Sequence, residues 1–448
     1  MVGTPGGVRA ADYIAEQFAA ARLHPGADGA WRQYFAVPGL RVPSPASSLE
    51  CGRKAFGPGR DFSPMAIGGQ GRFRGALVFA GYGITARCRR YDDYAGLDVR
   101  GAVVLIMRGE PHDGQRRSLW TGRRRWSPHA ALPAKLERAA EAGAAAALVV
   151  SPPLLAGKHD LLYCVWGGAE GPLPSMRVSA AAADALLAVG GGERALADLA
   201  RAINAGGRPA SRRLDVVVRG RADMVPGRGC NIIGTLPATE GDGRRKVVVG
   251  AHYDHLSIWG KRARDPGFAI RPGADDNASG VAAVILLARA MAAAPQRRLG
   301  YVFAAFDGEE YGFFGSGHFV ARSGDVKADV AAMLCFDQVG RMRKNELIVT
   351  GNVWDEPIGR AMREANHDAL GLRIWALPFV NTRGWSDQAP FARRGVPTML
   401  FYTGHHAHYH RVGDTVERIN ADGGARVGRY AFGVLRRLEA AEAARADD

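Results

Sequence analysis

The chain has 448 residues, of which 47% are hydrophobic and 23% are charged, a composition typical of a globular protein with ample core material. Its length suggests two or three domains, and its apolar runs are too short for a membrane span, which needs about 20 residues. The formal net charge is +15, but the arginines are scattered and are not interleaved with aromatic residues. We therefore expect no nucleic-acid partner and no membrane span.

The first part of the chain is predicted to form a helix and a strand. Apolar residues recur at roughly helical spacing over residues 6–23, and Thr4 can cap this helix. A strand is predicted over residues 31–37, and the proline cluster after it marks a boundary at about residue 45. No signal peptide is visible, which predicts a cytoplasmic protein if Met1 is the true start.

Residues 46–212 differ from the rest of the chain in composition and in the pattern of predicted elements. They contain short predicted strands and alanine-rich helices, and their histidines are isolated from one another. We expect a small α+β domain that lacks a convergent set of catalytic residues. An insertion at an exposed loop is tolerated, so this domain would interrupt an outer domain made of residues 1–45 and 213–448.

From about residue 213 onward, predicted strands alternate with predicted helices. The clearest strands are 247–252, 301–306, 331–336 and 396–402, and helices are predicted at about 277–293, 311–322, 356–369, 386–394 and 421–442. This alternation predicts an α/β fold with a mixed central β-sheet, of about eight strands, sandwiched by helices.

Polar residues that can bind metals or move protons follow these strands. They are His252, Asp254, Asp275, Asp276, Asp307, Glu309, Glu310, Asp337, His405, His406, His408 and His410. Ligands of open α/β sheets sit beyond the carboxyl ends of the strands, so we expect these side chains to converge.

Histidine and carboxylate ligands favour zinc, with manganese and cobalt as alternatives. Two such metals, roughly 3.5–4 Å apart, can share a bridging carboxylate and a hydroxide. A further carboxylate is then needed to take a proton from water. Glu309 and Glu310 suit this division, in which one binds metal and the other acts as the base.

Six motifs of the chain resemble those of a known enzyme family and occur in the same order. They are AHYDH, GADDNASG, FDGEEYGFFGS, CFDQVG, SDQAPFARRGVP and YHRVGDT. In these motifs the chain resembles the co-catalytic zinc aminopeptidases, peptidase family M28, which include bacterial leucyl aminopeptidase and yeast aminopeptidase Y. Glutamate carboxypeptidase is a relative of this family.

The resemblance implies two Zn²⁺ ions per chain and a set of ligands for them. His252 and Asp337 would bind one zinc, Glu310 and His410 would bind the other, and Asp275 would bridge both. The family usually has His-Thr-Pro near its final Asp-Thr pair, and this chain departs from that pattern after His410. His408 is therefore a rival ligand, although the distance to the Asp-Thr pair favours His410.

The resemblance also implies roles for residues that do not bind metal. Glu309 would be the general base and acid, and Asp254 would hydrogen-bond His252 and fix its tautomer. Asp276 is expected to lie next to the bridge without serving as it. The remaining histidines are expected to be structural or to lie on the substrate side: His255, His405, His406 and His408.

By this resemblance the protein is an aminopeptidase that hydrolyses the N-terminal bond of a peptide with a free N-terminus. A zinc-bridging hydroxide would attack, and Glu309 would accept its proton. Residues 46–212 would be a protease-associated domain that restricts substrate access. The family's exported members suggest a periplasmic or secreted protein whose leader preceded residues 3–6, where the mature relatives begin.

Three other functions remain open on the sequence alone. A carboxypeptidase would need a basic pocket, to which Arg383 could contribute, and a glutaminyl cyclase would use a single zinc. A receptor-like binding protein could keep the fold without catalysis, although relatives of that kind have lost the ligands that this chain keeps. The side-chain preference, the physiological peptide and the oligomeric state are not predicted.

Overall fold

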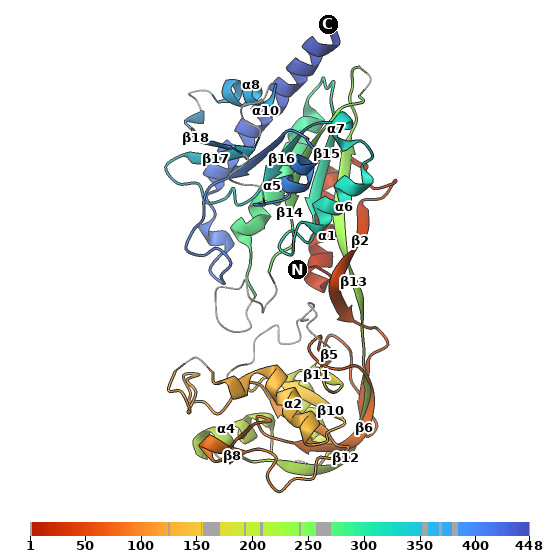
Figure 1. The fold of residues 1–448 in the computed structure, drawn as a ribbon, viewed down its shortest axis with the longest axis vertical. Coiled ribbons are helices and arrows are strands. Elements are labelled where there is room, and N and C mark those ends of the chain that lie inside the picture. The colour runs from red at the N-terminus through yellow and green to blue at the C-terminus, as the bar shows by residue number, and fades with distance from the viewer. Residues whose placement is uncertain are drawn as a thin grey trace. The chain divides into compact units, whose positions relative to one another are not determined.

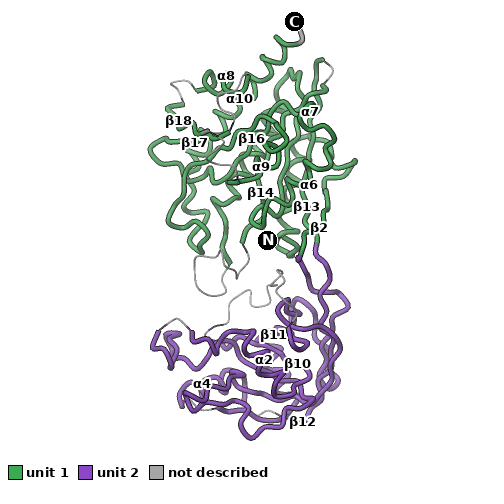
Figure 2. The backbone as a smooth tube through the Cα atoms, in the orientation of Figure 1, with its two compact units in different colours: residues 1–38, 228–448 green, residues 39–227 purple. Residues whose placement is uncertain are grey.

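A computed structural model describes residues 2–123, 126–153, 155, 171–191, 194–206, 209–241, 243–256, 270–351, 357–366, 370–378 and 384–447. The chain forms two compact units (Figure 2). Unit 1 comprises Met1–Pro38 and Arg228–Asp448, and unit 2 comprises Gly39–Gly227.

Unit 1 is built on a mixed nine-stranded sheet whose strand order is β1-β13-β15-β14-β16-β19-β17-β18, with β2 paired to β13 (Figure 1). The strands are β1 (His24–Pro25), β2 (Arg32–Pro43), β13 (Met224–Leu236), β14 (Lys246–His252), β15 (Gly300–Phe306), β16 (Val330–Phe336), β17 (Glu346–Gly351), β18 (Arg373–Pro378) and β19 (Thr398–Tyr402). Strand β14 lies between β15 and β16 and is parallel to both, so their carboxyl ends meet at one edge.

Helices pack on both faces of this sheet. They are α1 (Pro5–Ala20), α5 (Gly280–Ala293), α6 (Phe314–Arg322), α7 (Val326–Asp329), α8 (Ile358–Ala365), α9 (Gln388–Arg393) and α10 (Ala421–Asp447). Because successive side chains of a strand point to opposite faces, β14 contributes Val247 and Val249 to one core and Val248 to the other. The first core is shared with α1, α5, α8 and α10, and the second with α6, α7 and α9.

The predicted α/β fold with a mixed sheet between helices is confirmed. The four clearest predicted strands coincide with β14, β15, β16 and β19. Thr4 caps α1, since its side-chain oxygen accepts a hydrogen bond from the backbone N–H of Gly7 at 3.1 Å.

The boundaries of the two units differ from those expected at residues 45 and 213. Strand β2 continues through Pro38 and Pro43, which we had interpreted as strand breakers. Proline is tolerated at a sheet edge because it lacks only a donor. On the return path, the boundary between Gly227 and Arg228 falls inside β13, so no loop marks the passage between the units.

Unit 2 contains an eight-stranded sheet with the order β4-β3-β12-β6-β9-β10-β11-β5. These strands are β3 (Ser48–Cys51), β4 (Lys54–Ala55), β5 (Phe62–Pro64), β6 (Gly71–Phe79), β9 (Val103–Met107), β10 (Ala146–Val150), β11 (Ser175–Val178) and β12 (Arg212–Ala222). A two-stranded ribbon, β7 (Thr85–Ala86) and β8 (Tyr91–Asp92), and the helices α2 (Leu132–Glu141), α3 (Ala180–Val189) and α4 (Leu196–Gly206) complete it.

One helical segment of the described residues, Ala274–Ala293, is long and apolar enough to span a membrane by length and composition. Half of its most apolar window is buried inside the protein. Its side chains Val284, Leu287 and Met291 belong to the core that α5 shares with α1 and α10. The segment therefore packs as a core helix of unit 1.

Candidate functional site

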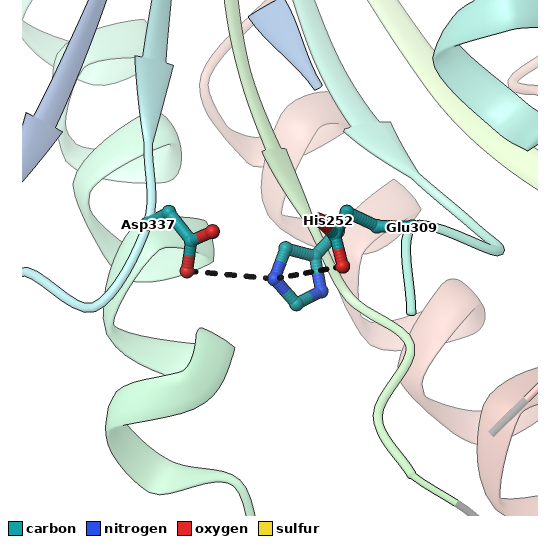
Figure 3. A group of neighbouring side chains, drawn as sticks. All are labelled: His252, Glu309 and Asp337. Atoms are coloured by element: carbon teal, nitrogen blue, oxygen red, sulfur yellow. Dashed lines mark ion pairs between the residues drawn. The ribbon is translucent and has the colours of Figure 1, made fainter. Parts of the chain in front are cut away.

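The carboxyl ends of β14, β15 and β16 bring a first group of side chains together. His252 is the last residue of β14, Asp337 follows β16 directly, and Glu309 lies three residues beyond β15. Nε2 of His252 lies 3.5 Å from Oδ1 of Asp337 and 4.0 Å from Oε2 of Glu309. Figure 3 shows the His252 ring between the two carboxylates.

A second group of side chains lies beside the first. Nδ1 of His255 is 2.8 Å from Oε1 of Glu310, and Nε2 of His410 is 3.5 Å from Oε2 of the same carboxylate. His255, Glu310 and His410 are all buried. Of the two rival histidines, the structure therefore places His410 in the site, whereas His408 is in neither group.

Asp276 lies between the two groups and contacts both. Its Oδ1 is 3.4 Å from Nε2 of His252, and its Oδ2 is 3.1 Å from Nε2 of His410. We expected Asp275 at this point, and the structure corrects that expectation. Oδ2 of Asp275 instead lies 3.2 Å from Nε2 of His406, away from both groups.

The loop before α5 explains why Asp276, rather than its neighbour, points into the site. Asp276 (φ −107°, ψ 88°) and Asn277 (φ −137°, ψ 42°) depart from helical geometry, so helical periodicity does not set the side-chain directions here. The backbone N–H groups of Asp275 and Asp276 donate to the Asp414 carboxylate. Asp275 accepts a hydrogen bond from the backbone N–H of Gly340 at 2.7 Å.

Asp254 supports the site in two ways. Its backbone carbonyl oxygen lies 3.0 Å from Nδ1 of His252 and fixes the ring with Nε2 toward the carboxylates. Its carboxylate Oδ1, at 3.8 Å from the same nitrogen, is too far for a hydrogen bond. That carboxylate accepts the backbone N–H of Glu309 at 3.0 Å instead. The expected contact is thus made by the backbone carbonyl of Asp254, which accepts a hydrogen bond from Nδ1 of His252, and not by the Asp254 carboxylate.

The electrostatics of the site are dominated by crowded, buried carboxylates. Burial raises the pKa of Glu309 well above its usual value, and the neighbouring Asp337 and Glu310 raise it further against the effect of His252. Burial lowers the pKa of His252, but the Glu309 and Asp337 carboxylates outweigh burial and raise it. Burial raises the pKa of Asp276, but the surrounding imidazoles prevail and lower it.

The residue types and spacings of both groups fit zinc, and Asp276 adjoins both groups. In a tetrahedral zinc site with bonds of about 2.0–2.1 Å, neighbouring ligand atoms lie about 3.3–3.4 Å apart. The contacts of His252 with Asp276 and Asp337, at 3.4 and 3.5 Å, match this spacing. Nε2 of His252, Oδ2 of Asp276 and Oδ1 of Asp337 are buried and make no hydrogen bond within the described residues. Buried carboxylates in this number need cations nearby.

A cavity of about 230 Å³ opens onto the site. Its described lining residues are Asp276, Glu309, Glu310, Asp337, Gln338, Gly384, Trp385, Leu400, Tyr402, His405, Tyr409 and His410. The lining combines the carboxylates with aromatic side chains, and the described part contains no lysine or arginine. Arg383, which we considered for a basic pocket, lies outside the described residues.

Sequence reasoning missed two members of the site, Asp276 and His255. The motif GADDNASG offered two adjacent aspartates, and spacing could not choose between them. His255 follows His252 by three residues in a non-helical stretch, where no periodicity predicts a shared direction. The only signal for either residue was its type, in the segment between the end of β14 and the start of α5.

Comparisons with known proteins relate part of the chain to a peptidase family. Residues 231–435 match Peptidase family M28. Over 229 residues the chain is 27% identical to leucine aminopeptidase 1 of Uncinocarpus reesii (strain UAMH 1704), covering 47% of this chain and 55% of that protein. Over 204 residues it is 24% identical to the uncharacterized protein YfbL of Escherichia coli (strain K12), covering 39% and 61%. The chain thus spans little more than half of these relatives.

Among solved structures, the chain is similar to BSAP, a zinc aminopeptidase from Bacillus subtilis. The match has a TM-score of 0.50 and 19% sequence identity, and it covers 98% of this chain and 90% of that one. At this identity the likeness concerns the fold.

Proposed function

Because residues 231–435 carry a domain of Peptidase family M28, we propose that the protein is a zinc-dependent aminopeptidase. The observation that carries the proposal is the position of Asp276, whose two carboxylate oxygens face His252 on one side and His410 on the other. A carboxylate in this position can hold two metal ions at once. The similarity to proteins named as leucine and zinc aminopeptidases supports the same reaction.

Two sets of side chains would hold the two zinc ions. His252, Asp337 and Asp276 would hold one ion, and Glu310, His410 and Asp276 would hold the other. Bound zinc lowers the pKa of water and polarises a carbonyl group. The bridging role that we first gave to Asp275 therefore passes to Asp276.

Glu309 would move the proton. Its carboxylate adjoins His252 and lines the cavity. Oε2 of Glu309 would accept a proton from the attacking water and pass it to the nitrogen of the leaving amine. The hydrogen bond from its backbone N–H to Asp254 holds the Glu309 backbone in place for this transfer.

The described lining of the cavity favours the N-terminus of a peptide over its C-terminus. Two bound zinc ions would offset the charge of the four carboxylates that line the cavity, so these carboxylates alone do not select either terminus. The described lining residues include no lysine or arginine, however, to pair with the terminal carboxylate that a carboxypeptidase binds. This supports an aminopeptidase rather than a carboxypeptidase.

A peptide panel combined with zinc analysis of the full chain tests the proposal. We expect two zinc ions per chain, cleavage of peptides that have a free N-terminus, and loss of cleavage when the N-terminus is acetylated. Amidation of the C-terminus should leave the rate unchanged. The Glu309→Gln variant serves as the control for contaminating peptidases.

Other results would identify the alternatives. Loss of cleavage upon C-terminal amidation would indicate a carboxypeptidase. One zinc ion per chain with cyclisation of N-terminal glutamine would indicate a glutaminyl cyclase. Two bound ions without turnover of any peptide would indicate a binding protein.

The assignment of unit 2 as a protease-associated domain stays a prediction. Among the described residues, both groups that could hold a metal ion lie in unit 1. This agrees with a non-catalytic role for unit 2.

A further inference from the structure

His255 lies where a metal ligand would be expected. Its Nδ1 is 2.8 Å from Oε1 of Glu310 and 3.8 Å from Oδ2 of Asp276. The exposed fraction of His255 is 8%, and neither of its ring nitrogens makes a hydrogen bond of normal geometry within the described residues. His252 has the same features: it is buried, its Nε2 faces two carboxylates, and that nitrogen makes no hydrogen bond within the described residues.

The ring of His255 is held in this orientation by its surroundings. It packs edge-to-face on the ring of His410, with the ring centroids 5.8 Å apart. Gly273 also lies close to this ring, and a Cβ atom at Gly273 would lie 2.9 Å from it. The chain thus has a glycine, at a positive φ of 64°, where any side chain would displace this imidazole.

The distances around the second position fit four ligands. The separations of His255 from Glu310 and Asp276 are 2.8 and 3.8 Å. Those of His410 from Asp276 and Glu310 are 3.1 and 3.5 Å. Two of these four distances are shorter, and two are longer, than the spacing of about 3.3–3.4 Å between ligand atoms of a tetrahedral zinc ion.

We propose that His255 is a fourth protein ligand of the second metal position, together with His410, Glu310 and Asp276. This inference rests on the proposed two-zinc function and extends it. The two positions then differ in their number of protein ligands. The first is held by His252, Asp337 and Asp276 and keeps a fourth coordination place for water or substrate, whereas the second would take water or substrate only as a fifth ligand.

The direct test is X-ray absorption at the zinc edge of the fully loaded, full-length protein, which counts imidazole ligands. Three histidines over two zinc ions give an average of about 1.5 imidazoles per zinc, and two histidines give about 1.0. The His255→Ala variant should lower the average from the first value to the second. His408→Ala, which removes a histidine outside both groups, is the matched control and should leave the average unchanged.

Zinc retention against a graded competing chelator gives a second readout. A residue that only hydrogen-bonds a ligand affects metal affinity by about 10–100-fold when it is replaced. We expect His255→Ala to weaken retention of the more tightly held zinc ion by more than about 100-fold, and His408→Ala to leave it unchanged.

An average near 1.0 in the unaltered protein with two bound zinc ions would overturn the role of His255 and leave the proposed function intact. This measurement does not depend on whether the variant folds. A protein that binds fewer than two zinc ions would overturn the two-zinc function itself, and the role of His255 with it.

Discussion

The Asp414 carboxylate accepts the backbone N–H of Asp276 at 3.1 Å, although 138 residues separate the two along the chain. The same Oδ2 atom accepts the N–H of Asp275, also at 3.1 Å. The peptide groups on both sides of Asp275 are thereby fixed, and the direction of the Asp276 side chain is fixed with them. Through these hydrogen bonds Asp414 holds the backbone that positions Asp276, the residue shared by both groups.

Replacing Asp414 should therefore weaken metal binding. The Asp414→Ala variant leaves two buried N–H groups without an acceptor and frees the loop that carries Asp276. We expect zinc affinity to fall by about 10–100-fold, as measured by competition with a chelator. Asp422→Ala, at an exposed position in the first turn of α10, is the control. Unchanged affinity in Asp414→Ala would mean that other contacts hold the loop.

Substitutions at the adjacent aspartates should have opposite consequences for metal content. Asp276→Asn removes the charge shared by the two positions, so we expect loss of bound zinc and of nearly all turnover. Asp275→Asn disturbs the contact with His406 and should keep zinc bound. Zinc content per folded chain distinguishes the two, and the reverse pattern would restore our first assignment.

Substitutions at the adjacent glutamates should also have different effects. Glu309→Gln keeps the size of the side chain and removes the base, so we expect both zinc ions to stay bound while kcat falls by about 10²–10⁴-fold. Glu310→Gln should instead reduce zinc content, because it alters a candidate ligand. Hydrolysis of aminoacyl anilides, measured beside metal analysis, checks both expectations. A Glu309→Gln protein as fast as the parent would show that another group is the base.

Removal of metal should destabilise the protein. Without cations, the carboxylates of Asp276, Glu310 and Asp337 stay crowded in a buried site and repel one another. A ligand that binds only the folded state stabilises it by about 2.7 kcal/mol at a concentration 100 times its Kd. We expect a chelator to lower Tm and added zinc to restore it. In Asp276→Asn, the same treatment should leave Tm almost unchanged.

Lys135 should be essential for the stability of unit 2. It is fully buried, and its Nζ donates hydrogen bonds to three backbone carbonyl oxygens, those of Tyr82, of Met107 at 2.9 Å and of Gly109 at 2.6 Å. Lys135→Met leaves these acceptors unsatisfied, at about 1–3 kcal/mol each. We expect the free energy of unfolding to fall by about 3 kcal/mol in denaturant titrations. The exposed Lys54→Met is the control, and an equal effect of both would contradict this role.

The elements that could be predicted from the sequence are those whose side chains follow a regular period. The β-branched run over Val247–Val249 is buried on both faces, and a strand of a central sheet is the structure that such a run forms. The strand ends that carry His252 and Asp337 followed from that assignment.

The side-chain directions of the remaining site residues could not be predicted, because these residues lie in irregular backbone without a regular period. Asp276 and His255 occupy loops whose directions are set by long-range contacts, such as the hydrogen bond to Asp414 and the packing on His410. The boundary of unit 2 was missed for a related reason, because β2 and β13 continue where a loop was expected.

The pairing of β2 with β13 also bears on how unit 2 can be inserted into unit 1. The polypeptide leaves unit 1 along one of these strands and returns along the other, so the departure and return lie side by side. Neighbouring ends are the condition under which one domain can be inserted into another. Unit 2 can therefore be gained, lost or exchanged as a cassette during evolution while the strands that present the site keep their partners.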